Sequence, residues 1–370
     1  MKRHEYRPKG TRAFGRLLSP VLALAIVAAF ALPAGNALAA YTFSYIPATH
    51  VATAAGNAAV DNLQLVALGG LVFHSVNGGS FDSNWSGVTV PAAITETINV
   101  TLSTGNGSVI WLGNAFLPAG ILFAAINVVA PANTSDTTVI DDSANSSAVT
   151  YVIDTLPGYI TAPGINYRQN LSQAFQGGVI LQGGSAGNTF NVLSVCCGGA
   201  THEPVSLYGG NGNDTFLVPA SNVNSPFPAI DGGDGSNTID MTAALALPSV
   251  RTVDLAAGTI AELTSGGTSR VIATSFANID VFKGNGQVDV LRGPDATNTW
   301  SIDGITAGSL TGGLSLSGFP NIVGGTGHDT FTVVPSATST ITIDGGLLSG
   351  PTGDSLIIIL TQSGEVLFSL

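Results

Sequence analysis

The sequence predicts an all-β chain and, within that class, a right-handed parallel β-helix or β-solenoid with rungs of about 20–30 residues. Charged residues make up only 9% of the chain, against roughly 25% in an ordinary soluble domain. Of the 23 acidic residues, 18 are aspartate, and there are 47 glycines. Aspartate, asparagine and glycine favour turns, whereas glutamate and lysine favour helices. The third observation is a series of short β-branched segments separated by repeated glycine-rich turns.

Residues 1–39 have the three-part layout of a secretory signal peptide. Six basic residues come first, an apolar run extends from Leu17 to Leu32, and Ala37-Leu38-Ala39 fits a cleavage site. The apolar run is short for a membrane span and is interrupted by Ser19 and Pro20. An N-terminal membrane anchor is the alternative interpretation. We expect a secreted protein, extracellular or at the cell surface, without a transmembrane span once the leader is removed.

Removal of this leader makes the chain more acidic. Five basic and 22 acidic residues remain, so the formal net charge changes from −12 to −17. Nucleic-acid binding requires a clustered basic surface, and we therefore expect no nucleic-acid partner. Divalent cations would be attracted by the same charge.

The segments after residue 40 read as strands separated by turns. Examples are Ile98–Leu102, Ser108–Leu112 and Thr150–Ile153. We expect residues 40–160 to be an N-terminal β-rich region that forms the first rungs, with a separate β-domain as the alternative. Residues 161–370 are expected to be a Gly/Asp-rich β-solenoid. Because the sequence ends at Leu370 without a polar cap, we expect a truncated chain or a fragment of a longer repeat protein.

One glycine-rich turn motif occurs twice in full. Gly209–Phe216 (GGNGNDTF) recurs 115 positions later as Gly324–Phe331 (GGTGHDTF). Weaker copies lie at Gly183–Phe190 and Gly293–Trp300. Each copy ends in an aromatic residue two positions after an aspartate or asparagine. We expect these aromatic side chains to point into a core that stacking of the next rung completes.

The two full copies extend to residues 209–217 and 324–332, which match G-G-x-G-x-D-x-U-x at every fixed position. The motif resembles RTX, or hemolysin-type calcium-binding, repeats. The overall pattern of short strands and glycine-rich turns is similar to that of bacterial β-helical surface adhesins. This resemblance implies that Asp214 and Asp329 hold calcium between successive turns, together with backbone carbonyls. The candidate metal-ligating residues are Gly209, Asn211, Asp214, Asp231, Asp234, Gly324, Thr326, Asp329 and Asp344.

The sequence also departs from that family. RTX nonapeptides run in tandem, whereas each full match here stands alone. In the neighbouring turns Asn188 or Asn237 occupies the aspartate position. The long spacing implies a rung wider than the narrow RTX roll, and RTX proteins usually carry an uncleaved C-terminal export signal. Ordinary turn chemistry, with glycine at positive φ and Asn or Asp in Asx-turns, is the alternative explanation of the motif.

Motifs for nucleophilic catalysis and for zinc are weak. Ser185 lies in a G-x-S-x-G pattern, but a strand-like segment follows it where a nucleophile elbow needs a helix. Ser355 lies in a G-D-S-L block without a histidine after it. The adjacent Cys196 and Cys197 cannot join distant loops, and their spacing from His202 fits no zinc pattern.

The expected function is that of an exported, non-catalytic structural or adhesive protein. Calcium would neutralise and stiffen the turns outside the cell, and a polar face would contact a surface glycan or matrix. The open ends of a solenoid would also permit self-association. The competing hypothesis is a β-helical polysaccharide hydrolase or lyase, with Asp141 and Asp142, or Asp231 and Asp234, as paired carboxylates.

Overall fold

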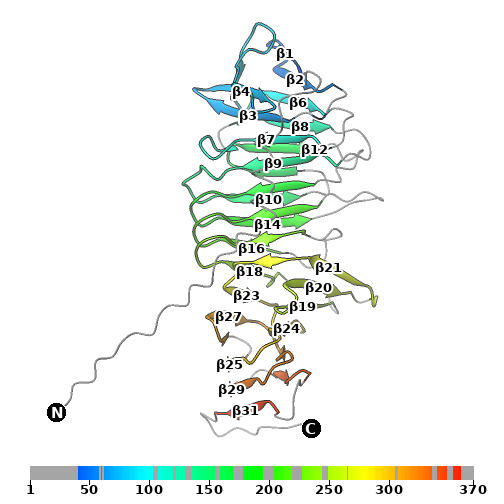
Figure 1. Ribbon diagram of the computed structural model, residues 1–370, viewed down its shortest axis with the longest axis vertical. Coiled ribbons are helices and arrows are strands. Elements are labelled where there is room, and N and C mark those ends of the chain that lie inside the picture. The colour runs from blue at the N-terminus through cyan, green and yellow to red at the C-terminus, as the bar shows by residue number, and fades with distance from the viewer. Residues whose placement is uncertain are drawn as a thin grey trace, which may run out of the picture. The chain divides into compact units, whose positions relative to one another are not determined.

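The computed structural model is all-β, with long sheets of mostly parallel strands and no helix among the residues it describes (Figure 1). Residues 39–370 form a compact unit of their own. The described residues are 41–57, 60, 62–102, 107–119, 122, 124–129, 135–154, 159–169, 178–194, 204–218, 227–243, 249–264, 266–304, 307–335, 340–347 and 353–359. The leader and the Cys196–Cys197 pair lie outside them.

Among the described residues, the main sheet has 16 strands and extends from β1 to β31. In their order across the sheet its strands are β1 (Thr42–Ile46), β2 (Val51–Ala55), β6 (Thr97–Thr101), β8 (Ala125–Val129), β12 (Ile165–Gln169), β11 (Tyr159–Ala162), β10 (Thr150–Asp154), β14 (Thr189–Ser194), β16 (Thr215–Leu217), β18 (Thr238–Asp240), β23 (Val281–Lys283), β27 (Leu314–Ser317), β26 (Ala307–Leu310), β25 (Thr299–Asp303), β29 (Thr330–Val334) and β31 (Ser355–Ile358).

Two smaller sheets contain the other strands that the structure describes. The second sheet has nine strands, in the order β22 (Phe276–Ala277), β17 (Ile230–Asp231), β15 (Val205–Tyr208), β13 (Val179–Gln182), β9 (Thr137–Asp141), β7 (Val109–Leu112), β3 (Leu63–Leu68), β4 (Leu71–Val76) and β5 (Val90–Pro91). The third has six, in the order β21 (Ser269–Ala273), β20 (Thr259–Leu263), β19 (Val250–Asp254), β24 (Val290–Arg292), β28 (Asn321–Val323) and β30 (Thr342–Asp344).

The chain passes repeatedly from a strand of a smaller sheet to a strand of the main sheet. β13 is followed by β14, β15 by β16 and β17 by β18, and each strand pairs in parallel with its counterpart one pass later. Thr215, for example, pairs with Thr189, 26 residues before it, and with Thr238, 23 residues after it. β8, β9 and β10 pair in the same way with β12, β13 and β14, so the sheets are continuous across residue 160.

Within the main sheet, two antiparallel meanders of the described strands interrupt this parallel order at corresponding places. β10–β11–β12 lies between β14 and β8, and β25–β26–β27 lies between β29 and β23. In each meander the first strand pairs in parallel with a later strand and the third with an earlier one. The alternation of apolar and polar residues predicts strands here, but it does not predict that they form hairpins. Strand propensity does not specify which strands pair, because tertiary packing determines the pairing.

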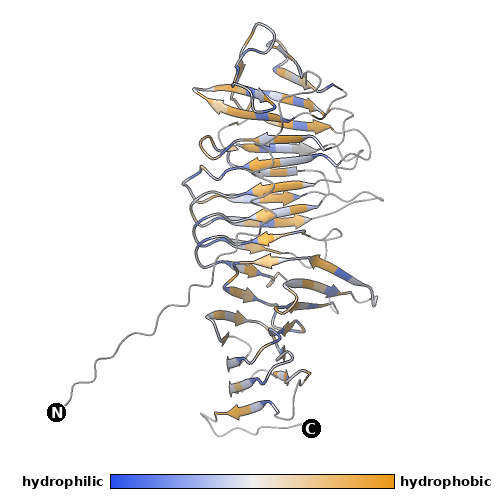
Figure 2. Cartoon of the chain, viewed as in Figure 1, coloured by the Kyte–Doolittle hydropathy of each residue, from blue (hydrophilic) through white to orange (hydrophobic). Residues whose placement is uncertain are grey.

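Side chains alternate between core and surface along strands such as β10, β16 and β29. Many arrows in Figure 2 carry hydrophobic residues next to more hydrophilic ones. The four aromatic residues of the glycine-rich motif, together with Tyr151 on β10, form columns in the core. Tyr151, Phe190 and Phe216 stack with ring centroids 5.0 and 4.7 Å apart, and Trp300 stacks on Phe331 at 5.7 Å. All five are at most 2% exposed, so the predicted inward orientation of the motif aromatics is confirmed.

Candidate functional site

The candidate site is the turn that follows a strand of a smaller sheet and leads into the main sheet. In Gly209–Asp214, Gly210 and Gly212 have φ near +98° and +99°, a region that only glycine enters at low cost. At Gly209 a Cβ atom would lie 2.4 Å from Asp214 Oδ2 and 2.5 Å from the Gly232 carbonyl oxygen. Glycine is therefore required here because successive turns and the Asp214 carboxyl approach the backbone too closely for any side chain.

Asn188, Asp214 and Asn237 form a buried ladder beneath three successive turns, each at most 1% exposed. The Asn188 backbone N–H donates to Asp214 Oδ1 at 2.6 Å, and the Asp214 N–H donates to Asn237 Oδ1 at 2.9 Å. The ladder continues at both ends, from the Val149 N–H to Asn188 Oδ1 and from the Asn237 N–H to Asp280 Oδ2. Each side chain thus ties its own turn to the turn before it.

A second ladder repeats this arrangement near the C-terminal end of the described chain. The Asn298 N–H donates to Asp329 Oδ1 at 2.9 Å, and the Asp329 N–H donates to Asp354 Oδ1 at 2.8 Å. Asp329 is 1% exposed. The two full copies of the sequence motif therefore place Asp214 and Asp329 in equivalent positions on separate ladders.

The asparagines and the aspartates of these ladders differ at one terminal side-chain atom, which is Nδ2 in asparagine and Oδ2 in aspartate. Asn188 Nδ2 donates to the carbonyl oxygens of Gly184 and Gly209, and Asn237 Nδ2 donates to those of Gly233 and Asn278. The corresponding atom of Asp214 is Oδ2, an acceptor, and it has no hydrogen-bond partner. Carboxylate and carbonyl oxygens facing one another repel unless a proton or a cation lies between them.

Asp329 has the same unsatisfied atom. Its Oδ2 is buried without a partner, and a Cβ on Gly324 would lie 2.4 Å from it and 2.5 Å from the Gly345 carbonyl oxygen.

At Asp214 burial is the largest influence on the carboxyl and raises its pKa from 3.8 to about 6, against the opposing effect of the hydrogen bonds from Asn188. The ladders therefore contain two buried carboxyl groups, each with one oxygen that has no hydrogen-bond partner.

The other predicted ligands lie outside the ladders. Asp231 Oδ1 accepts from the Gly233 N–H and from Asn278 Nδ2, and Asp344 Oδ1 accepts from the Gly346 N–H. Asn211 and Asp234 are exposed, and Thr326 is half-buried. The backbone N–H groups of Gly209 and Gly324 donate to the carbonyl oxygens of Asp231 and Asp344. Among the described residues no three carboxylate, imidazole or thiol side chains converge as a metal-binding group.

The amide members of the ladders, Asn188 and Asn237, were not predicted as functional positions. The signal was present, because Asn188 and Asn237 stand where the full motif has aspartate. Asp280 and Asp354, which end the two ladders, lie in turns that do not match the motif. Their roles follow only from the pairing of strands far apart in the sequence.

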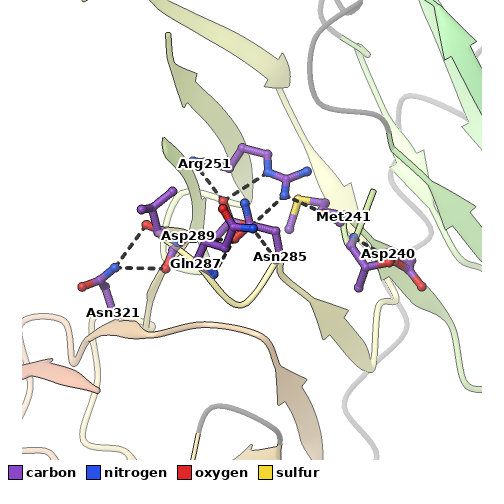
Figure 3. A network of polar contacts seen from close by, with 9 residues as sticks. Asp240, Met241, Arg251, Asn285, Gln287, Asp289 and Asn321 are labelled. Atoms are coloured by element: carbon purple, nitrogen blue, oxygen red, sulfur yellow. Dashed lines mark hydrogen bonds and ion pairs between the residues drawn. The ribbon is translucent and has the colours of Figure 1, made fainter. Parts of the chain in front are cut away.

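A buried ion pair joins Arg251 on β19 to Asp289, which directly precedes β24 of the same sheet (Figure 3). Arg251 Nε donates to Asp289 Oδ1 at 3.2 Å, and Arg251 Nη2 donates to Asp289 Oδ2 at 2.8 Å and to the Met241 carbonyl oxygen at 2.5 Å. Both charged side chains are 0% exposed. Arg251 lies on β19 and Met241 directly follows β18, so the guanidinium connects the third sheet with the main sheet.

The other basic side chains that the structure describes after the leader are also paired. Arg270 pairs with Glu262, Lys283 with Asp240 and Arg292 with Asp254. An acidic polysaccharide in a lyase needs cations that face the substrate. Arg251, Arg270, Lys283 and Arg292 are thus each engaged by a carboxylate.

The carboxylates proposed for a hydrolase have structural partners. Asp141 Oδ1 accepts from the Ser143 N–H and hydroxyl, and Asp142 Oδ2 accepts from the Tyr151 hydroxyl at 2.7 Å and from Asn145 Nδ2. Asp142 is 0% exposed. Ser185 lies in a turn that leads into the strand β14 rather than a helix, which agrees with the rejection of a nucleophile elbow.

Neither a protein-family model nor a curated protein matches this chain. The described residues include no helix long and apolar enough to cross a membrane. The assignment of a function therefore rests on the ladders, the ion pairs and the sheet topology.

Proposed function

We propose that this protein is an exported, non-catalytic structural or adhesive scaffold, built as a right-handed β-solenoid with rungs of about 20–30 residues. The parallel, in-register pairing of β14, β16 and β18 and the alternation between sheets support the solenoid. The observation that carries the function is the pair of buried polar ladders. Their side chains satisfy backbone groups of neighbouring turns instead of facing a solvent-open cleft, which is the arrangement of a stack of rungs rather than of a catalytic groove.

Calcium binding at the ladders is part of this proposal. The unsatisfied Oδ2 atoms of Asp214 and Asp329 are hard oxygen donors next to backbone carbonyl oxygens, and this is the donor chemistry that calcium prefers. Asp214 would act with the carbonyls of Gly210 and Gly232. Bound calcium would be the electropositive partner of these oxygens, in the place where the amide N–H donors of Asn188 and Asn237 meet carbonyl oxygens in the adjacent turns. Export from a low-calcium cytoplasm would then stiffen the turns.

Calcium titration of the chelator-treated protein tests this proposal. We expect calcium to raise the melting temperature by about 3–8 °C at saturating concentration, because binding to the folded state alone contributes about RT ln(1 + [Ca²⁺]/Kd). Scanning calorimetry with and without calcium measures the change. Magnesium is the matched control, because it demands a tighter octahedral site and should have a smaller effect. A melting temperature that calcium leaves unchanged, with no binding below millimolar concentration, would reject calcium binding.

A further inference from the structure

Three neighbouring segments at the C-terminal end of β3 present large apolar side chains to solvent. They are the β3–β4 turn with Leu68, the connection after β5 with Ile94, and the loop after β7 with Phe116. These side chains are 53%, 81% and 88% exposed. We call the three segments, residues 66–72, 91–95 and 113–119, the apolar tip.

Backbone contacts place the three segments along one edge. β3 and β7 are parallel, with Leu65 opposite Leu112, so the chain leaves both strands on the same side. The Gly113 N–H donates to the Leu65 carbonyl oxygen, and Gln64 Nε2 donates to the Gly113 carbonyl oxygen at 3.1 Å. The connection after β5 joins them through the Ala92 N–H, which donates to the Gly70 carbonyl oxygen.

Phe116 lies in a turn that is closed by hydrogen bonds to Asn114. Asn114 Oδ1 accepts from the backbone N–H groups of Phe116 and Leu117, both at 2.8 Å, and the Asn114 N–H donates to the Leu117 carbonyl oxygen. A turn closed by an asparagine in this way has few alternative conformations. These hydrogen bonds hold the backbone of the turn, and the Phe116 side chain that it carries is 88% exposed.

The chemistry of the tip favours a lipid surface over a protein partner. The three segments contain no charged residue. Their polar side chains are used internally, since Asn114 caps its own turn and the Thr95 hydroxyl donates to Glu96. Protein interfaces combine apolar contacts with about one hydrogen bond per 100–200 Å², whereas the interface of a fluid membrane requires apolar and aromatic insertion without directional partners.

We propose that the apolar tip inserts Phe116, Ile94 and Leu68 into the interface of an uncharged lipid membrane and so anchors this end of the scaffold to a surface. Residues 39–370 contain five basic and 22 acidic residues, a formal net charge of −17, and anionic lipids would repel them. The proposal is independent of calcium, because the tip includes none of the ladder residues.

Flotation of the unit of residues 39–370 with vesicles tests the proposal. We expect binding to zwitterionic phosphatidylcholine vesicles and weaker binding to vesicles that contain phosphatidylserine. Phe116→Ser should lower the partition coefficient about tenfold or more, because burying one large apolar side chain contributes a factor of that size. Leu347→Ser is the matched control, since Leu347 is 78% exposed and lies in the connection after β30. It should leave partition unchanged.

A second variant reports insertion directly. In Phe116→Trp the added indole should show a blue-shifted emission with phosphatidylcholine vesicles after subtraction of the wild-type signal. Absence of vesicle binding by the wild type, or equal loss of binding in Phe116→Ser and Leu347→Ser, overturns the proposal. Association into a defined soluble oligomer that Phe116→Ser disrupts would also overturn it, in favour of a protein partner.

Discussion

Asp214→Asn will stabilise the folded protein by about 2–3 kcal/mol at pH 8 in calcium-free buffer. The substitution places an amide donor where Asp214 Oδ2 has no partner, as Asn188 and Asn237 already have in the adjacent turns. The magnitude follows from the pKa of Asp214, which burial raises from 3.8 to about 6, at about 1.4 kcal/mol per pH unit. Chemical denaturation at pH 8 measures it.

The stability difference between the wild type and Asp214→Asn depends on pH. Because the pKa of Asp214 is higher in the folded state than in the unfolded state, its contribution to stability is fully present below about pH 4. It is lost as the pH rises through about 6. The wild type should therefore lose stability between pH 4 and pH 7 in the absence of calcium. Asp214→Asn should remove this part of the pH dependence.

A second variant, Asp234→Asn, and the response to calcium are the controls for Asp214→Asn. Asp234→Asn removes a charge from the exposed side of the next turn without touching the ladder, and it should change stability by no more than about 0.5 kcal/mol. Calcium should stabilise the wild type more than Asp214→Asn, because the variant has lost one of the two proposed sites. A destabilised Asp214→Asn protein would show that the carboxylate is not in the position of an asparagine amide.

Arg251→Met will destabilise the protein by about 3–5 kcal/mol. The substitution leaves Asp289 buried without its counter-ion, and removal of one partner of a buried ion pair usually costs this much. It also leaves the Met241 carbonyl oxygen without the guanidinium that joins the main sheet to β19. Urea denaturation of the variant, followed by tyrosine and tryptophan fluorescence, measures the loss.

The double variant Arg251→Met with Asp289→Leu separates charge from packing. Replacement of both partners by apolar residues removes the uncompensated charge, so most of the lost stability should return. Arg292→Met provides a second reference, because the Arg292 and Asp254 side chains are 29% and 24% exposed and water screens their interaction. It should cost about 1 kcal/mol or less. A similar small cost for Arg251→Met would show that the buried pair does not hold the third sheet in place.

Much of the fold followed from local pattern. The short β-branched segments, the glycine turns and the inward aromatic residues Phe190, Phe216 and Phe331 were predicted and are present, because each depends on a few consecutive residues. The importance of Asp214 and Asp329 was also visible in the repeated motif. The meanders β10–β12 and β25–β27 were not predicted, since extended segments have similar propensities whether their neighbours are parallel or antiparallel.

The sequence by itself determined an all-β chain with two equivalent acidic turns and an excess of negative charge. Tertiary structure decided which of the acidic residues share an environment. Asp214 is buried against an asparagine 23 residues later, while Asp231 is bound by Asn278 from a different turn. Arg251 reaches Asp289 only because β19 pairs with β24. The physical reason is that burial and hydrogen-bond partners depend on the register between distant strands, and a local motif does not specify that register.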